Sequence, residues 1–442
     1  MTIPVKAGAT TPAKSPRART RRVFPWIVFT LTFGLLLSDY MSRQVLSAVF
    51  PPLKQAWGLT NTQLGSLSSV VALTVGVLAV PLSLVGDRWG RARAIVAMAV
   101  VWSLATIGCA LATGYGQLLT ARFLIGVGEA AYGSVGLAVV LAVFAAHRRA
   151  SLAGAFTAGS SFGSVLGVAL GGVLAVQFGW RAAFVVMGVF GLVLALLYRV
   201  VISERRLAAH QADDAGPPLA AGQRRAHLST LFATPAVVLA YLGNGLQLLI
   251  AGALFAWLPS YFNRGYALPT DKAAKLAALF LLIMGIGMIV CGLVTDRIGA
   301  TRPTGPWTTA IAYAAATLIL LGAAFAVAPG GLQMLLLAGG CFFAAGTTGP
   351  TSALVARLTH ESIRATAFGT VAFFNNLLGL AAGPLVIGIL ADRYGLDTAM
   401  KFVPLVAVGA IVLLFGGRAA YPSSLAKLDA AAADDKTRRG TA

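Results

Sequence analysis

The sequence predicts an all-α integral membrane protein with twelve transmembrane helices arranged as two related six-helix bundles. Composition is the first observation: 58% of the residues are hydrophobic and only 11% are charged, whereas soluble domains have about 25% charged residues. The second is that apolar stretches of about 18 residues or more, long enough to cross a bilayer, recur along the whole chain. The third is an internal repeat, because Asp87-Arg88-x-Gly90 returns in the second half as Asp296-Arg297-x-Gly299.

Twelve spans are expected, and each must be helical because lipid cannot satisfy free backbone polar groups. A basic stretch followed by an apolar one at the N-terminus resembles a signal peptide, but the apolar run continues to Phe50 without a small-residue cleavage site, so it is the first span. The predicted spans cover residues 24–49, 62–85, 94–112, 118–145, 151–177, 182–202, 235–261, 275–294, 306–328, 332–356, 365–391 and 399–420.

These spans predict two membrane domains, an N-terminal bundle at 24–202 and a C-terminal bundle at 235–420. The stretch 203–234 is polar and rich in charge and proline, which predicts a flexible cytoplasmic linker. Residues 1–23 and 421–442 are expected to be cytoplasmic tails without regular structure. Two pseudo-symmetric halves of this kind predict a substrate site between them, near the middle of the membrane.

The net charge of +20 indicates topology rather than nucleic-acid binding. Most of the 34 Lys and Arg residues fall in loops on the side that holds both termini. Basic loops stay in the cytoplasm, so both termini are expected there. We expect a multi-pass monomer in a bacterial inner (plasma) membrane, with the lipid bilayer and a small substrate as its partners and no nucleic acid.

Four charged residues lie inside apolar spans: Asp39 and Arg43 in the first, Arg122 and Glu129 in the fourth. A charge at membrane depth costs from about 3 to more than 10 kcal/mol, and residues that bear this cost usually face a water-filled cavity. Residues four or seven apart share a helix face, and the set is formally neutral. Glu129 is therefore the first candidate for a proton carrier and Asp39 the second, with Arg122 and Arg43 modulating them or binding an anionic group.

The second half carries amides and rings in its spans instead of charges. Asn375 and Asn376 are adjacent and cannot both face inward, so at least one is expected to serve packing. Trp257 and Tyr261 are expected to be anchors at the membrane interface. With Arg43 and Arg122, the candidate substrate contacts are Tyr40, Tyr132, Asn244, Gln247, Phe373, Asn375 and Asn376. Asn244 and Gln247 share a helix face, and interhelical hydrogen bonding is the alternative role for both. A wall with charges facing a wall with apolar groups and amides would suit an amphiphile, and also an aromatic carboxylate.

The repeated Asp-Arg-x-Gly pattern resembles the signature of the major facilitator superfamily, and the resemblance covers about residues 24–420. One departure is Ser83, where the family pattern usually has Gly. The resemblance implies the major facilitator fold, secondary transport by alternating access, and a cytoplasmic gate. The gate residues would be Asp87, Arg88, Gly90, Arg91, Asp296 and Arg297.

Within that superfamily the chain is most similar to the Spinster-like branch, which is associated with lysolipids and sphingolipids. The fourth span, from Arg122 through Glu129 to Tyr132, resembles that branch's signature. In the first span the branch has Asn-Tyr-Leu-Asp-Arg, whereas this chain has Asp39-Tyr40-Met41-Ser42-Arg43, so the carboxylate has moved by three residues. The resemblance implies a transporter of a lysolipid-like amphiphile. The carboxylates inside the spans indicate protons as the coupling ion, and no cofactor is expected.

Three alternatives stay open. The organic-anion branch has a similar first and fourth span, which would make the substrate a small carboxylate. Gly163-x-x-x-Gly167 resembles a fifth-span pattern of drug or metabolite exporters, although Val168 replaces its usual Pro. A channel would require rings of like charge or a filter loop, which the mixed-sign set does not resemble. The four histidines fall in loops or the linker, and no enzyme, metal or phosphate-binding motif is present, so no enzymatic activity is expected.

Overall fold

A computed structural model describes residues 16–210, 231–232, 234–359 and 363–440. In this part of the chain there are twelve helical segments long and apolar enough to cross a membrane. The predicted fold class, an all-helical membrane protein with twelve spans, is therefore confirmed.

The first half contains six spans and one short helix. The bounds are α1 (Pro16–Trp57), α2 (Asn61–Trp89), α3 (Arg91–Leu111), α4 (Tyr115–Glu129) continued by α5 (Tyr132–Val143), α6 (Ala146–Phe178), α7 (Trp180–Val201) and the short α8 (Glu204–Ala209).

The second half repeats this layout with more interruptions. The bounds are α9 (Pro235–Gly265), α10 (Thr270–Thr301), α11 (Gly305–Ala326), α12 (Gly331–Ala344) continued by α13 (Thr348–Leu358), α14 (Arg364–Phe374) continued by the π-helix η3 (Asn375–Ala381) and α15 (Ala382–Tyr394), then α16 (Leu396–Phe402), the 3-10 turn η4 (Val403–Leu405) and α17 (Val406–Gly440).

The helices extend further than the sequence predicted at both ends. Helix α1 begins at Pro16 and α17 ends at Gly440, so the prediction of irregular tails is wrong for residues 16–23 and 421–440. Helix α8 lies inside the predicted linker, most of which, from 211 to 230, falls outside the described residues. The predicted spans end where the apolar residues end, but a helix can continue into polar sequence because its backbone hydrogen bonds do not require apolar side chains.

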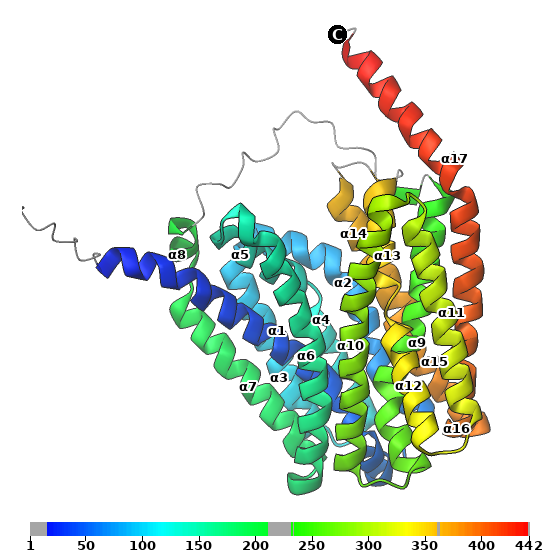
Figure 1. The fold of residues 1–442 in the computed structure, drawn as a ribbon. Helices are drawn as coiled ribbons and strands as arrows, with labels where there is room; N and C mark the ends of the chain where they lie inside the picture. The colour runs from blue at the N-terminus through cyan, green and yellow to red at the C-terminus, as the bar shows by residue number, and fades with distance from the viewer. Residues whose placement is uncertain (1–15, 211–230, 233, 360–362, 441–442) are drawn as a thin grey trace, which may run out of the picture.

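The two halves lie side by side, with the start of α1, helix α8 and the C-terminal part of α17 all at the same end (Figure 1). We call this end the linker end and the opposite one the far end. Helix α1 packs along α6 in the first half, and α9 packs along α17 in the second. Across the interface, α2 packs on α15 and η3, and α6 packs on α10.

The fourth span of each half is broken at a corresponding place. Helices α4 and α5 are separated at Ala130–Ala131, and α12 and α13 at Ala345–Thr347. A break inside a span frees backbone groups, which a membrane protein tolerates only where they are buried in protein or line a cavity. Discontinuous spans often mark the substrate and ion sites of transporters.

Glycines let α6 approach α1 closely. A Cβ at Gly163 would lie 2.8 Å from the carbonyl oxygen of Leu37, and one at Gly167 would lie 2.8 Å from the backbone of Met41. Small residues at such crossings allow helix backbones to pack in a membrane. This contact explains the Gly163-x-x-x-Gly167 pattern as helix packing between α1 and α6.

Replacing Gly167 by Ala should lower the unfolding temperature, because the added methyl collides with backbone that cannot rotate away; such overpacking costs about 1–3 kcal/mol. Gly154 lies on the same helix, and a Cβ there would meet nothing within 4 Å, so Gly154→Ala is the matched control. Ala favours helix over Gly, so the control should keep or raise the unfolding temperature. Thermal unfolding followed by tryptophan fluorescence distinguishes the two variants, and equal shifts would contradict close packing at Gly167.

Candidate functional site

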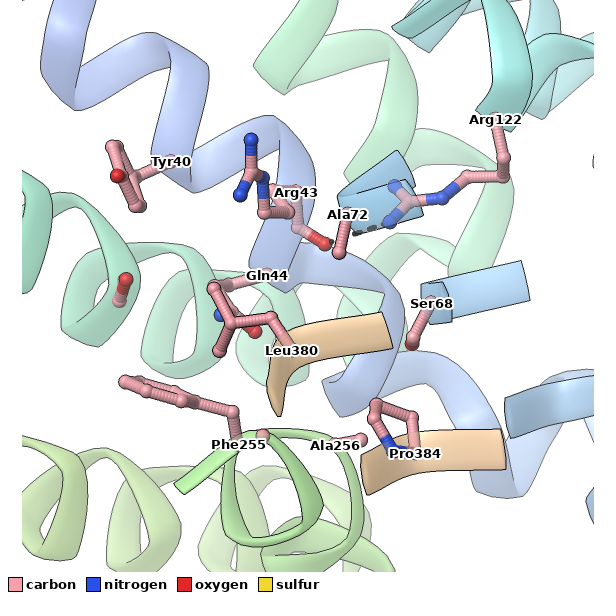
Figure 2. A pocket seen from close by; sticks show the side chains of 12 residues that line it. Tyr40, Arg43, Gln44, Ser68, Ala72, Arg122, Phe255, Ala256, Leu380 and Pro384 are labelled. Carbon is pink, nitrogen blue, oxygen red and sulfur yellow. Dashed lines mark hydrogen bonds between the residues drawn. The ribbon is translucent and has the colours of Figure 1, made fainter. Parts of the chain in front are cut away.

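A cavity of about 70 Å³ lies between the two halves, beside the buried charges (Figure 2). Its first wall comes from α1, α2, α4 and α6, and its second from α9, η3 and α15. The lining residues are Tyr40, Arg43, Gln44, Ser68, Ala72, Arg122, Ser164, Gly252, Phe255, Ala256, Leu380 and Pro384.

The two walls differ in chemistry. The first-half wall carries two guanidinium groups, Arg43 and Arg122, together with hydroxyl and amide groups. The second-half wall offers Phe255, Leu380 and Pro384 and no charged side chain among its lining residues. Such a cavity can bind a molecule with an anionic group at one end and an apolar body at the other.

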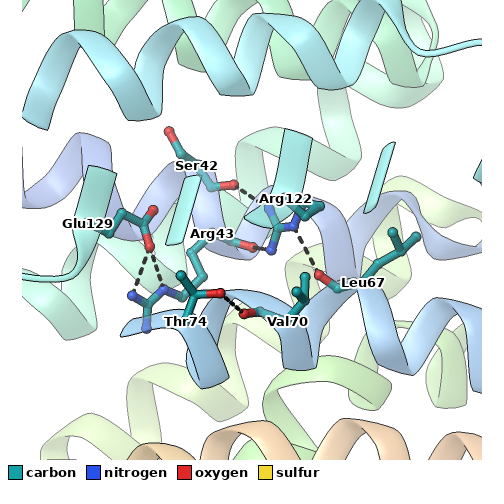
Figure 3. A network of polar contacts seen from close by, with 7 residues as sticks. All are labelled: Ser42, Arg43, Leu67, Val70, Thr74, Arg122 and Glu129. Carbon is teal, nitrogen blue, oxygen red and sulfur yellow. Dashed lines mark hydrogen bonds and ion pairs between the residues drawn. The ribbon is translucent and has the colours of Figure 1, made fainter. Parts of the chain in front are cut away.

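The strongest interaction at the cavity is the ion pair between Arg43 of α1 and Glu129, the last residue of α4 (Figure 3). The Nε and Nη2 atoms of Arg43 donate to Glu129 Oε2 at 3.0 and 2.8 Å. The Glu129 side chain is fully buried, whereas that of Arg43 keeps 14% of its surface exposed. Arg43 is thus the partner that a molecule in the cavity can reach without moving another residue.

Arg122 binds backbone instead of a carboxylate. Its guanidinium donates to the carbonyl oxygens of Leu67, Ser42 and Arg43, each at 3.1 Å (Figure 3). These bonds connect α4 to α2 and α1, so this buried residue holds three helices of the first half together. The structure places Arg122 at the cavity wall, but its position on the same helix face as Glu129 does not produce an ion pair with it.

Asp39 lies one turn before Arg43 and is 3% exposed. Its carboxyl group lies beside that of Glu129. Two oxygens, Asp39 Oδ1 and Glu129 Oε1, have no hydrogen-bond partner among the described residues. The structure therefore brings the two predicted carboxyl groups together next to one guanidinium, Arg43.

The two predicted tyrosines have different surroundings. The ring of Tyr40 lies 5.3 Å from the Arg43 guanidinium carbon, at the cavity. Tyr132 is fully buried, packs edge-on against Trp102, and donates its hydroxyl to the carbonyl oxygen of Thr32 at 2.6 Å. Its polar group is bound within the first half, and Tyr132 is not among the lining residues of the cavity.

The amides predicted as substrate contacts mostly connect helices. Asn244 of α9 donates to Asn375 Oδ1 at 2.7 Å and accepts from the hydroxyl of Thr347, also at 2.7 Å. Gln247 donates to Thr317 Oγ1 at 3.0 Å and to the carbonyl of Ala344. Both α9 side chains are fully buried and do not line the cavity, so their geometry matches interhelical hydrogen bonding, the other interpretation that the sequence left open.

The two adjacent asparagines at the start of the π-helix η3 meet different neighbours. Asn375 faces α9, whereas Asn376 lies against Gly76 of α2 and donates to the carbonyl of Ala372 in its own span. Phe373 is half-buried and packs edge-on against Phe374, away from the lining residues. The lining residues of this span, Leu380 and Pro384, were not predicted, since an apolar residue on a span gives no signal of function.

The prediction that Trp257 and Tyr261 are anchors at the membrane interface is wrong, because both side chains are buried inside the protein. Trp257 Nε1 donates to the carbonyl of Pro384 at 3.0 Å and its ring packs on Phe50 of the first half. Tyr261 accepts from Gln333 at 2.9 Å. Aromatic residues near a helix end predict an interface anchor only when that face meets lipid, which the sequence does not specify.

The repeated signature lies at the linker end. Gly90 has φ of 100°, a conformation that favours glycine, and connects α2 to α3. Arg88, Asp296 and Arg297 are exposed, while the Asp87 side chain lies outside the described residues. Arg91 follows Gly90 as the first residue of α3.

A carboxylate that the sequence did not single out caps the start of α3. Glu204 of α8 accepts from the backbone N–H groups of Ala92 and Arg93 at 2.7 and 3.3 Å. An anion is favourable at a helix N-terminus. The segment after α7 is therefore attached to the predicted gate loop, and the only hint in the sequence was a Ser before the Glu that begins a short helix.

A family model described as Major Facilitator Superfamily matches residues 32–377. The chain belongs to this superfamily. Human protein spinster homolog 1 is 28% identical over 392 residues, covering 83% of this chain and 73% of that protein. A probable L-galactonate transporter of Escherichia coli K12 is 25% identical over 392 residues, covering 85% of this chain and 84% of the other.

Solved structures agree on the fold. The bacterial homolog of the human lysosomal transporter Spinster, in an inward-facing and unoccupied conformation, superposes with a TM-score of 0.81 at 16% identity. The match covers 91% of this chain and 98% of the other. The predicted resemblance to the Spinster-like branch is confirmed, and this chain is a major facilitator transporter with the corresponding twelve-helix fold.

Asn244→Leu should lower the free energy of unfolding by about 2–4 kcal/mol, because Thr347 and Asn375 would each lose a buried partner. Asn376→Leu is the control, since the amide of Asn376 donates within its own span. Thermal unfolding of the two variants in the same detergent is the measurement. A normal unfolding temperature for Asn244→Leu would favour the sequence-based expectation that this amide contacts substrate.

Proposed function

We propose that this protein is a secondary active transporter that couples an amphiphilic, lysolipid-like anion to protons by alternating access. The observation that carries the proposal is the Arg43–Glu129 pair, in which the basic partner borders the cavity and the acidic partner is fully buried. The guanidinium of such a pair can release its carboxylate partner and bind an incoming anion in its place. Membership of a superfamily of transporters supports the general activity.

Coupling follows from competition for one guanidinium. An anionic group entering the cavity meets the exposed part of Arg43 and competes with Glu129 for its two donors. A carboxylate displaced in a buried site would leave an unpaired charge, which is strongly unfavourable. Binding a proton removes that charge, so anion and proton occupy the site together and the charge of the site stays unchanged.

Asp39 fits the same scheme as a second acceptor. Its carboxyl lies beside Glu129, and two neighbouring carboxyl groups titrate as a pair rather than independently. A proton taken up by either group relieves their repulsion. We therefore propose that Glu129 carries the coupling proton and that Asp39 beside it favours uptake of that proton, with Arg43 as the switch and Arg122 as the residue that positions α1.

The apolar wall supports an amphiphile as substrate. With an anionic head at Arg43, an attached chain or ring would contact Phe255, Leu380 and Pro384 on the facing wall. The motifs in the first and fourth spans resemble those of the Spinster-like branch, which is associated with lysolipids, and this resemblance supports a lipid-like body. A small organic acid is the second candidate, favoured by the cavity volume of about 70 Å³ and by the similarity to the probable L-galactonate transporter.

We also propose how the protein is oriented in the membrane and which parts of it move during transport. The basic residues at the linker end would place it in the cytoplasm of a bacterial plasma membrane. Residues 24–202 and 235–420 would rock against each other, the loops at Asp87 and Asp296 forming the cytoplasmic gate. The proposed transport unit is a monomer, because both walls of the cavity come from the two halves of the same chain.

Glu129→Gln should abolish proton-driven accumulation of substrate while exchange of labelled for unlabelled substrate continues. The neutral amide cannot release a proton, but the cavity and Arg43 remain. Asp271→Asn is the control, since Asp271 pairs with Lys275 on its own helix and should keep full accumulation. Uptake into proteoliposomes at different imposed pH gradients is the measurement, and unchanged proton dependence in Glu129→Gln would refute the coupling assignment.

The substrate class is tested by thermal stabilisation of the protein in lipid nanodiscs. Lysophospholipids of increasing chain length should raise the unfolding temperature more than galactonate or benzoate do. The effect should be lost in Arg43→Gln/Glu129→Gln, which removes both charges of the pair together. Stabilisation by the small acids alone would replace the lipid-like substrate with the second candidate.

A further inference from the structure

One carboxylate of the second half caps a helix of the first half at the far end. Asp392 of α15 accepts from the backbone N–H groups of Asn61 and Thr62 at 2.7 and 2.8 Å. It also accepts from the Asn61 side-chain amide at 2.8 Å and the Thr62 hydroxyl at 2.6 Å. All four donors belong to the first turn of α2, where backbone N–H groups lack partners within the helix.

These contacts are charge-assisted and well placed for strength. Hydrogen bonds to an ionised acceptor are about twice as strong as neutral ones, and the N-terminus of a helix favours an anion. Thr60 and Gln63 already form a capping box at this helix, so Asp392 is not needed to start α2. Its four bonds instead connect the two halves.

Two glycines bring the backbones of α2 and α15 together next to these bonds, along a contact that we call the α2–α15 seam. A Cβ at Gly388 would lie 2.5 Å from the carbonyl oxygen of Asn61, and one at Gly65 would collide with the carbonyl oxygen of Pro384. Pro384 lines the cavity, and Asp392 follows it by eight residues, or about 12 Å along the helix. The α2–α15 seam therefore closes the cavity on its far side.

Other charged groups gather around Asn61. Lys54 Nζ donates to Asn61 Oδ1 at 2.9 Å, and Arg264 Nη2 approaches the same oxygen at 3.4 Å. Both cations lie close enough to Asp392 to interact with its charge, and Asp397 lies near Arg264. The cluster draws on α1, α2, α9, α15 and α16, so it connects both halves at a single point.

The linker half of α2 has no comparable seam among the described residues. Val77, Val80, Leu84 and Trp89 are each more than half exposed, whereas Leu64 and Leu67 in the far half are fully buried. The close approaches between α6 and α10, at Gly172 with Ala274 and at Gly285 with Ser161, also lie between the far end and the middle of the spans. The halves are thus held together on one side of the cavity.

We propose that Asp392 is the latch of the far end: its carboxylate holds the far-end seam shut by capping α2 and must leave that helix in each transport cycle. The proposal goes beyond the function proposed above, since it depends on neither the substrate nor the proton. The sequence contains a matching signal, because Asp392-Arg393-x-Gly395 is a third copy of the Asp-Arg-x-Gly pattern, at the opposite end of the molecule from the other two.

The test measures the opening of each end by electron–electron double resonance in lipid nanodiscs, on a variant without native cysteines. Spin labels at Gln177 and Leu332, both at the far end, report on the far side; labels at Ser151 and Ala300 report on the linker side. Asp392→Asn keeps the shape but removes the charge. The ratio of far-end-open to far-end-closed molecules should rise about five- to thirty-fold, as for loss of a strong cap, with a matching shortening at the linker end.

Asp271→Asn is the control for charge, because it changes a far-end carboxylate of the same half that pairs within its own helix. Gly388→Ala is a second route to the same opening, since its methyl would push against Asn61, and Gly322→Ala, with nothing within 4 Å, is its control. Unchanged distances in Asp392→Asn would overturn the latch, and opening in Gly388→Ala shows that the labels detect such a change. An equal shift in Asp271→Asn would show a general charge effect and overturn it as well.

Discussion

The Arg43–Glu129 ion pair is the interaction around which the first half is organised. It connects the middle of α1 to the last residue of α4, where the fourth span breaks. The negative end of the α4 dipole lies at the same place, so the guanidinium compensates both the carboxylate and the helix end. A buried ion pair adds little stability compared with apolar packing. Its presence in a membrane span therefore favours a role in transport.

Arg122 makes the placement of this pair possible. By binding three carbonyl oxygens of α1 and α2, it holds α4 in register with the helix that carries Arg43. The second half connects the equivalent spans without charges, since Asn244 of α9 binds Thr347 at the break between α12 and α13. The two halves share one architecture but use ionic and neutral groups for the same contact. Only the ionic contact can respond to protons or anions.

The α2–α15 seam between the halves is close because glycines at the contact have no side chains to separate the two backbones. Glycines at 65 and 388 allow α2 and α15 to touch, and Asp392 adds a charge-assisted contact at the end of that seam. A seam of backbone contacts and a few polar bonds can separate without exposing a large apolar surface. The far side of the cavity is thus closed by contacts that can separate. Alternating access requires such a closure, because each side of the cavity must open in turn.

The sequence alone determined the twelve helices, the two related halves, the superfamily and the four charges inside the first and fourth spans. The length of each apolar stretch and the internal repeat are properties of neighbouring residues, and lipid permits only helices for such stretches. It did not determine partners: Arg122 binds carbonyls rather than Glu129, while Tyr132 and Asn244 bind other helices. Nor did it mark Leu380 and Pro384 as cavity-lining residues or Asp392 as a partner of α2. Which face of a helix meets lipid, cavity or neighbouring helix depends on how helices rotate and cross, and that is decided only when all of them pack together.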